Sequence, residues 1–253
     1  MRPYILAETN WQTVKKERFE LAVLPWGATE AHNYHLPYSA DNIETELITA
    51  ESARLAWEKG GKVIVLPTIP VGVNTGQRDI YLDLNFAPST QMAILTDIIE
   101  VLNFQKINKL LIVNGHGGND FRPLIRELGI KYPDMFFGLC NWYQVLDKKQ
   151  YFENQGDHAD EMETSLLLYL RHELVLPNDK WGKGVEKKNK IKGFREGWAW
   201  TERKWSKISE DTGIGNPSLA TAEKGKIYFK DLTLKISGLI TDLCGANAGD
   251  LYE

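Results

Sequence analysis

Four of the five histidines in this chain lie in three short segments that also carry acids and glycines. These segments are 30–41, which begins Glu-Ala-His, 114–119 (Asn-Gly-His-Gly-Gly-Asn) and 158–163 (His-Ala-Asp-Glu-Met-Glu). Neutral imidazole and carboxylate are the donors that hold borderline and hard divalent cations in proteins. This grouping therefore predicts a metal site with hydrolytic chemistry, assembled from three distant parts of the chain.

The donors in these segments outnumber the ligands that one catalytic zinc ion needs. They indicate two divalent metal ions that share one carboxylate and one water, and a water bridged in this way becomes a hydroxide near neutral pH. His158 is then left to transfer protons instead of binding metal. Zinc is the first expectation for such donors, with manganese, iron or cobalt as alternatives. The set is Glu30, His32, Asp41, His116, His158 and Glu163.

Several of these residues also have a purely structural interpretation. Glu30 and His32 could form a surface salt bridge, although the spacing Glu-x-His in an extended chain directs both side chains to the same side. Asp41 could cap a helix, and the acids at 160–163 could interact with a helix dipole. His116 stands between glycines, which permit positive φ and a close approach of backbone to ligand. A histidine in that setting is poor core material.

The remaining histidines are interpreted as structural. His35 is expected to support the site or the fold from outside the ligand set. His172 lies near the end of a predicted helix and is expected to be an ordinary residue of the last turn.

Short apolar runs bounded by Gly, Pro or Asn predict buried parallel strands at 21–25, 62–67, 109–114 and 135–140. Between and after them, helical periodicity predicts helices at 41–59, 89–104, 121–131, 161–172 and 220–239, the second capped by Ser89 or Thr90. This alternation indicates an α/β fold with a mostly parallel sheet and helices on both faces. Because ligands bind at the carboxyl ends of strands in such sheets, we expect the segments after the first and third strands to share one site.

A length of 253 residues fits one large α/β domain or two small ones, and we expect a single domain over residues 1–253. A net charge of −4 argues against nucleic acid or an anionic membrane as a partner. No apolar run reaches the roughly 18 residues of a membrane span, and the N-terminus lacks a signal-peptide pattern, so we expect a cytoplasmic protein. Its two cysteines, Cys140 and Cys244, are expected to be reduced and buried.

The segment 178–211 differs from the rest of the chain, being basic and rich in tryptophan. One interpretation is a long excursion on the surface without a special role. The other is a lid or a subunit contact, since amphipathic tryptophans pack well against a neighbour or a substrate.

In order along the chain, the motifs resemble the signatures of the creatininase (creatinine amidohydrolase) family. The matching stretches are 24–41, 114–119, 158–165, 213–217 and 220–225. The resemblance implies a three-layer α/β/α fold and a binuclear metal amidohydrolase. It also implies a homo-oligomer, with a hexamer as the expected form.

The resemblance places family ligands on individual residues of this chain. Glu30 and His32 fall on the family's first acid and histidine, one for each metal ion. Asp41 falls on the aspartate that bridges the two ions, and His116 on the later histidine ligand.

The third motif supplies one further expected ligand. In creatinine-hydrolysing members, the second metal takes a glutamate two residues after the later histidine, where this chain has Gly118. We therefore expect Glu163, which falls on the family's glutamate before Thr-Ser, to supply that carboxylate and to take part in catalysis. His158 falls on a histidine placed near the substrate in the family.

Departures from the family pattern weaken the case for creatinine as substrate. They comprise Gly117, Gly118, Asn33-Tyr34 and the region 72–88. The expected function is cleavage of a non-peptide C–N bond in a small cyclic amide or formamide by a hydroxide that bridges the metals. One alternative is a metal-dependent peptidase that acts on a short or modified peptide. Another is a non-catalytic metal-binding assembly protein.

Overall fold

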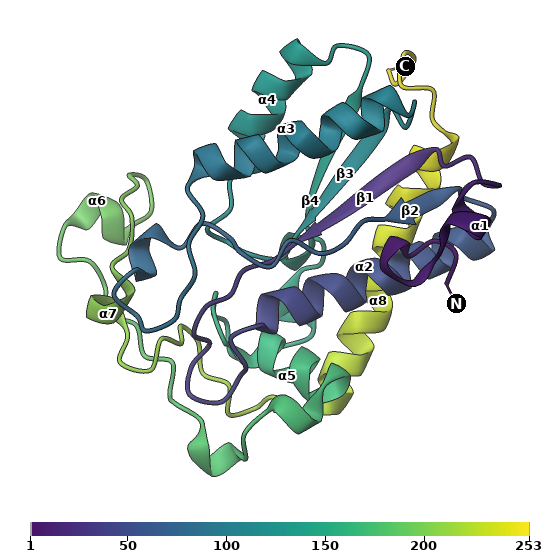
Figure 1. The fold of residues 1–253 in the computed structure, drawn as a ribbon. Coiled ribbons are helices and arrows are strands. Elements are labelled where there is room, and N and C mark those ends of the chain that lie inside the picture. Colours follow the sequence, from purple (N-terminus) through teal and green to yellow (C-terminus); the bar gives the residue numbers. More distant parts are fainter. Residues whose placement is uncertain (1, 253) are drawn as a thin grey trace.

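Four parallel strands form the centre of the molecule, which is seen here in a computed structural model that describes residues 2–252 (Figure 1). The strand order is β2-β1-β3-β4, and all three neighbouring pairs are parallel. The expected strands are confirmed, and within the described residues the sheet is wholly parallel. The strands are β1 (Leu21–Trp26), β2 (Val63–Val65), β3 (Lys109–Asn114) and β4 (Phe136–Asn141).

Five long helices follow the predicted periodicity closely. They are α2 (Ala40–Glu58), α3 (Pro88–Phe104), α4 (Phe121–Lys131), α5 (Glu161–Leu170) and α8 (Ala222–Gly245). Three single-turn helices complete the set, namely α1 (Trp11–Val14), α6 (Lys192–Arg195) and α7 (Trp205–Ile208).

Some predicted helix ends were wrong. α3 starts at Pro88 with Ala87 at the N-cap position and no side-chain cap, so neither Ser89 nor Thr90 caps it. Proline suits the first helical position. An N–H at that position has no partner within the helix, so its absence in proline costs nothing, and the φ of proline is already helical. α5 ends at Leu170, and His172 begins a separate 3-10 turn.

Helices cover both faces of the sheet, which confirms the three-layer architecture. Alternate residues of each strand point to opposite faces. Leu21, Val23 and Leu111 pack with α2, α5 and α8 in one core. Ala22, Leu24 and Ile112 pack with α3 and α4 in the other. Figure 1 shows these two helical layers on either side of the strands.

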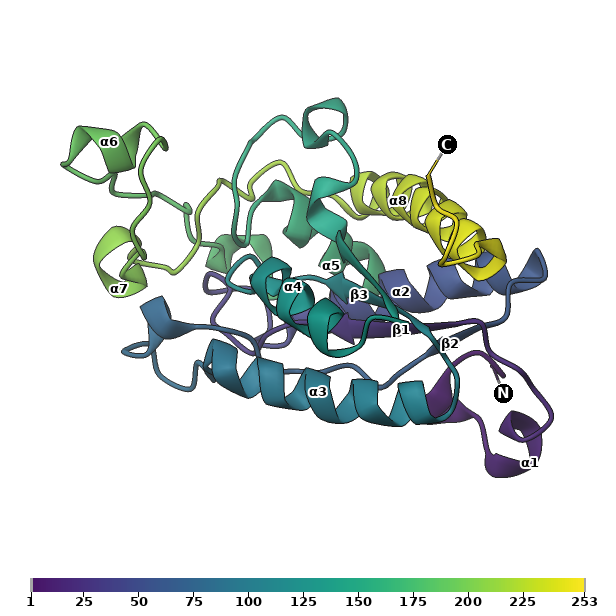
Figure 2. The same cartoon turned by 90° about the horizontal axis from the view of Figure 1, so that it is seen from above.

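The strand order creates a crevice at the carboxyl ends of β1 and β3. β1 lies between β2 and β3, so the chain leaves β1 toward one edge of the sheet and later returns to its other side. Ligands bind at such switch points in open α/β sheets. The loops that follow β1 and β3 carry the first two histidine motifs, at 30–41 and 114–119. In Figures 1 and 2, α6 and α7 of the excursion lie at the end of the molecule opposite the two termini.

The structure also bears on the expected absence of a membrane span and on the state of the two cysteines. Within residues 2–252, no helix is long and apolar enough to cross a membrane. Cys140 and Cys244 are buried free thiols.

Candidate metal centre

The first group of potential metal ligands joins Glu30, Asp41 and His116. The Nδ1 atom of His116 lies 2.8 Å from Oε1 of Glu30 and 3.1 Å from Oδ2 of Asp41. Glu30 follows β1, His116 follows β3 and Asp41 lies in the first turn of α2. All three side chains are buried, and one donor atom from each lies within 4.8 Å of the others.

A second group joins His32, Asp41 and Glu163, and one donor atom from each of these residues also lies within 4.8 Å of the others. Nε2 of His32 is 3.0 Å from Oδ1 of Asp41, so Asp41 directs one oxygen to each group. Glu163 comes from the first turn of α5. The geometry therefore brings the five expected ligands together around one shared aspartate, which is the arrangement a carboxylate-bridged pair of cations needs. Asp41 does not cap α2, because Ser39 occupies that position.

A backbone carbonyl orients each histidine of the centre by accepting a hydrogen bond from the ring nitrogen that points away from the acids. His32 Nδ1 lies 3.0 Å from the Glu30 carbonyl, His116 Nε2 lies 3.0 Å from that of Val73, and His158 Nε2 lies 2.8 Å from that of Ala31. In the neutral ring, an N–H that donates to a carbonyl leaves the lone pair of the other nitrogen free for a cation. Outer partners of this kind fix the tautomer and the ring direction of metal-binding histidines.

Glycines in the second motif provide space. A Cβ atom at Gly118 would lie 2.2 Å from the Val73 carbonyl oxygen and 2.4 Å from Nε2 of His116. A glutamate there would displace the carbonyl that orients His116. A Cβ at Gly117 would meet nothing within 4 Å. Neither glycine has positive φ, so close approach is the reason for glycine at 118.

Local structure at the third motif aims His158 and Glu163. Asp160 caps α5 by accepting hydrogen bonds from the backbone N–H groups of Met162 and Glu163. Ala159 takes a left-handed conformation with φ 49°, and its N–H donates to the Glu163 carboxylate. A non-glycine residue held in this region is strained, and such strain concentrates at functional sites.

The stretch 213–217 fixes the backbone of His158. His158 and Ile214 form an isolated antiparallel bridge, with Ile214 N–H donating to the His158 carbonyl at 2.8 Å. Gly215 has φ 124°, and a Cβ there would lie 2.6 Å from Cβ of Asp160. Only glycine satisfies both conditions. The C-terminal motif thus belongs to the site, although it contributes no donor side chain to it.

The charges of the centre are strongly coupled. Burial alone would lower the pKa of His32, but the attraction and hydrogen bond of Asp41 outweigh burial and raise the pKa to about 10. Glu30 and Asp41 likewise raise the pKa of His116 well above its usual range despite burial. The two histidines lower the pKa of Asp41, again against burial. Protons on the histidines therefore balance the acids of the metal-free protein, and divalent cations would replace those protons.

His158 differs from the other two histidines. Its Nδ1 is 3.9 Å from Oε1 of Glu30, too far for a hydrogen bond. Burial, with repulsion from His32, lowers its pKa, so the ring is neutral at neutral pH. Glu30, His32 and His158 also form a third possible donor group. The position of His158 nevertheless suits proton transfer, because a neutral ring with a free Nδ1 can accept a proton.

The excursion 178–211 reaches this histidine. Trp205 is buried and packs edge-on against His158, with ring centroids 4.6 Å apart. Arg203 lies over the Trp205 ring and pairs with Asp157 at 2.8 Å. By contrast, Trp198 and Trp200 are exposed. Part of the excursion is therefore a wall of the site, whereas Trp198 and Trp200 lie on the surface.

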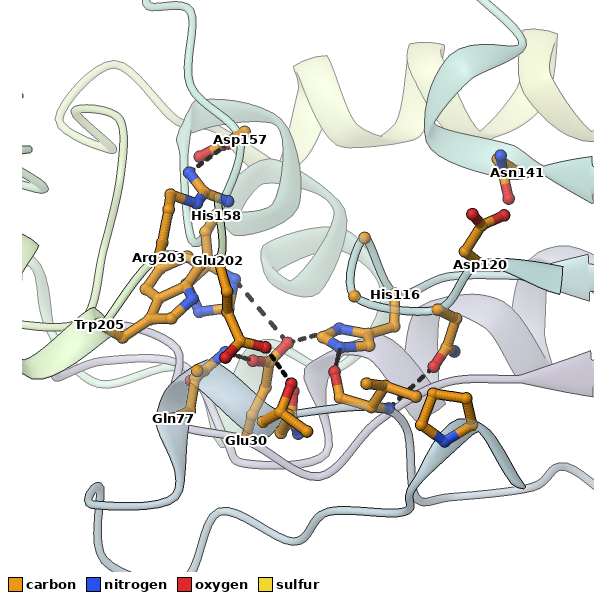
Figure 3. Close-up of a pocket in the computed structure, with 18 of the residues that line it drawn as sticks. Glu30, Gln77, His116, Asp120, Asn141, Asp157, His158, Glu202, Arg203 and Trp205 are labelled. Atoms are coloured by element: carbon orange, nitrogen blue, oxygen red, sulfur yellow. Dashed lines mark hydrogen bonds and ion pairs between the residues drawn. The ribbon is translucent and has the colours of Figure 1, made fainter. Parts of the chain in front are cut away.

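A cavity of about 600 Å³ opens beside the first ligand group. Figure 3 shows Glu30 and His116 in its middle, His158, Arg203 and Trp205 on one side, and Asp120 and Asn141 on the other. Its lining comes from the loops after β1, β2, β3 and β4 and from the excursion. A cavity of this size accommodates ligands up to drug-like dimensions.

Other motif residues have structural roles. His35 lies 2.9 Å from the Thr164 hydroxyl and stacks on Trp181, and burial lowers its pKa to about 4. Glu161 pairs with Lys224 at 2.5 Å. His172 is exposed, away from the centre.

Residues that the motifs do not reveal also belong here. Gln77 is buried and donates from its amide to Glu30. Glu44, one helical turn after Asp41, is fully buried, and neither carboxylate oxygen has a hydrogen-bond partner. The only sequence signal for Glu44 is that an acid three residues after Asp41 falls on the same helical face. No pattern marks Gln77.

Glu44 makes stability depend on pH. Burial, followed by repulsion from Glu163 and Asp41, raises its pKa well above the usual range. The folded protein therefore keeps a proton that the unfolded chain releases, and the free energy of unfolding falls as pH rises above the ordinary glutamate range. We expect Glu44→Gln to stabilise the metal-free protein by about 1–3 kcal/mol at pH 8.5, with a smaller gain at pH 5.5.

Urea unfolding of the metal-free protein at the two pH values measures this difference. Glu46→Gln is the control, because Glu46 lies on the same helix and is exposed. Equal effects of the two substitutions at both pH values would contradict the expectation.

Comparison with known proteins agrees with this geometry. The family model described as creatininase, creatinine amidohydrolase, matches residues 7–240. The chain belongs to the creatininase family. A solved protein of Bacteroides fragilis, provisionally named a creatinine amidohydrolase, is 40% identical with a TM-score of 0.93, and the match covers 100% of both chains.

More distant members show the range of the family. A mutant creatininase complexed with creatine is 20% identical, with a TM-score of 0.78 over 96% of this chain and 99% of its own. The mycofactocin precursor peptide peptidase of Mycobacterium ulcerans is 25% identical over 83% of this chain and 80% of its own length. Creatininase structures named as Zn-Zn and Mn forms are also similar. This creatininase-family chain is thus similar to proteins named for different substrates.

Proposed function

We propose that this protein is a metal-dependent amidohydrolase that cleaves a non-peptide C–N bond in a cyclic amide or formamide. One observation carries the proposal: two groups of buried donors, Glu30/Asp41/His116 and His32/Asp41/Glu163, meet at one aspartate. They border a cavity large enough for a small amide. The nitrogen and oxygen donors fit zinc first, with manganese or iron as alternatives.

The donor residues define what two bound cations would do. Cations in these groups would supply Lewis acidity toward a substrate carbonyl and lower the pKa of a water molecule. Glu30 and His116 would hold one cation, His32 and Glu163 the other, and Asp41 would contact both. Two divalent cations with the carboxylates of Glu30, Asp41 and Glu163 would give the centre a net charge of +1. A positive centre would stabilise the hydroxide that attacks the substrate.

His158 would handle the proton. Its Nε2–H donates to the Ala31 carbonyl, so Nδ1 faces the donor groups with a free lone pair. The neutral ring accepts a proton at Nδ1 from the attacking water and passes it to the leaving nitrogen, which is general acid–base catalysis. Trp205 packs against this ring and keeps bulk water from that side.

The second candidate function is peptidase activity on a short or modified peptide. The similarity to a protein named mycofactocin precursor peptide peptidase favours it. The cavity also extends on both sides of Glu30 and His116, which suits a substrate longer than a single ring (Figure 3).

A substrate screen of the protein loaded with Zn²⁺, Mn²⁺ or Fe²⁺ separates these candidates. We expect ring opening of a cyclic amide, or release of formate together with the amine from a formamide. Cleavage confined to short peptides would favour the peptidase. Bound metal without hydrolysis of any substrate class would favour a non-catalytic metal-binding assembly protein. Light scattering would check the proposed homo-oligomer, for which a hexamer is the expected form.

A further inference from the structure

We propose that Gln77 is a positioning residue that restricts Glu30 to one-oxygen binding of the first metal ion. The inference rests on the proposed function, because it concerns the Glu30/Asp41/His116 group. Gln77 lies outside the histidine motifs, in the 3-10 turn Thr75–Gln77.

The contact itself is specific. Nε2 of Gln77 donates to Oε2 of Glu30, while Oε1 of Glu30 faces Nδ1 of His116 at 2.8 Å. The two carboxylate oxygens thus have different partners. The amide must present its NH₂ group, since its carbonyl oxygen would repel the carboxylate. Both side chains are buried, with Gln77 3% and Glu30 1% exposed, so water does not compete for the bond.

The surrounding loop holds Gln77 in this position. Its N–H donates to the Asn74 carbonyl. Asn74 is in turn anchored by its own N–H to the Asn85 side chain at 2.7 Å, and by its amide to the Leu84 carbonyl at 3.0 Å. Gly76 abuts the excursion, since a Cβ there would lie 2.1 Å from the Arg203 carbonyl oxygen. Gln77 is therefore fixed on both sides.

This arrangement decides how Glu30 can bind a cation. A free carboxylate can rotate and chelate a metal through both oxygens. Gln77 occupies Oε2, so Oε1 alone remains for the cation that Asp41 and His116 share. One-oxygen binding leaves a coordination position open, and catalytic metal sites need such a position for water or substrate.

The test is a Co²⁺ titration of metal-free protein, followed by visible absorption. Gln77→Met keeps similar length and volume but removes the donor. We expect wild-type protein to bind two Co²⁺ ions in two steps. In Gln77→Met, one step should weaken about 10- to 100-fold with an altered spectrum, as for other outer partners of metal ligands, while the other step keeps its affinity and spectrum.

Gln91→Met is the matched control. Gln91 is 1% exposed, and its amide donates at 2.8 Å to Asn119 instead of a carboxylate. We expect this variant to keep both wild-type steps. Gln77→Asn, which retains the amide on a shorter side chain, serves as a second variant if Gln77→Met does not fold, and it should also weaken one step only.

The outcomes separate this inference from the proposed function. Wild-type protein that binds no Co²⁺ would overturn the proposed function and the inference with it. Two wild-type steps that persist unchanged in the folded Gln77 variant would overturn the inference alone. Equal weakening of both steps, or the same loss in Gln91→Met, would also overturn it, because a general packing defect would then explain the result.

Discussion

Asp41→Asn is expected to abolish binding of both metal ions and to reduce hydrolysis at least about 10³-fold. Asp41 is the one residue common to both donor groups, with one oxygen directed to His32 and the other to His116. Asparagine has nearly the same shape but no charge, and its NH₂ group would face one of the two cations. The substitution therefore removes the bridge without removing the side chain.

The same substitution should destabilise the metal-free protein by about 3–5 kcal/mol near neutral pH, because it removes the carboxylate partner of the buried, charged His32 and one of the two partners of His116. The sign follows from the raised pKa values. A histidine with a raised folded pKa contributes stability that is present at low pH and lost as pH rises through that pKa, about 10 for His32. Removal of Asp41 abolishes this contribution.

Elemental analysis, hydrolysis assays and urea unfolding measure these effects. Asp160→Asn is the matched control, because Asp160 is also a buried aspartate at a helix start but belongs to neither donor group. Asparagine is an equally good N-cap, so this variant should retain both metals. Retention of two metal ions by Asp41→Asn would contradict the bridging role.

Glu163→Gln is expected to reduce the metal content from two ions to one and to lower activity about 10²- to 10³-fold. Glu163 belongs only to the second group, with His32 and Asp41. The first group keeps all of its donors in this variant. The loss should therefore be selective, in contrast to the loss in Asp41→Asn.

The second site should also bind metal more weakly in acid. Burial is the main cause that raises the pKa of Glu163 to about 8. A carboxyl group must lose its proton to bind a cation, so occupancy of the second site should rise between pH 6 and pH 8 while protons are released. Metal titrations at the two pH values measure this trend.

Glu161→Gln is the control for Glu163→Gln. Glu161 is a buried glutamate in the same helical turn that pairs with Lys224 and accepts from Asn154 N–H, away from the donor groups. We expect it to keep two metal ions. If Glu163→Gln also keeps both ions, then another donor completes the second site. Gly118→Glu should not restore the lost ion, because its Cβ would collide with the Val73 carbonyl.

Local patterns in the sequence were sufficient for most of the fold. Apolar runs such as 109–114 and helical periodicity such as 121–131 are local signals, and β3 and α4 have those bounds. Helix ends were less predictable, because the first turn depends on φ and on which N–H groups are free. Pro88 accordingly starts α3 where a polar cap was expected.

Residue types and their spacing were enough to predict which side chains meet at the centre. The strand–helix alternation implies a parallel sheet, and a parallel sheet brings the ends of β1 and β3 together. Glu30, Asp41 and His116 could therefore be expected in one place before any coordinates were known.

The way those residues are held depends on contacts that form only in the folded chain. Backbone carbonyls of Val73 and Ala31 orient His116 and His158, and a carbonyl has no signature in the sequence. The contact of Gln77 with Glu30 joins positions 47 residues apart, and the unpartnered burial of Glu44 depends on how α2, α5 and α8 pack. Residue type limits the chemistry that is available, whereas tautomer, charge and ligand geometry depend on distances that only the folded chain sets.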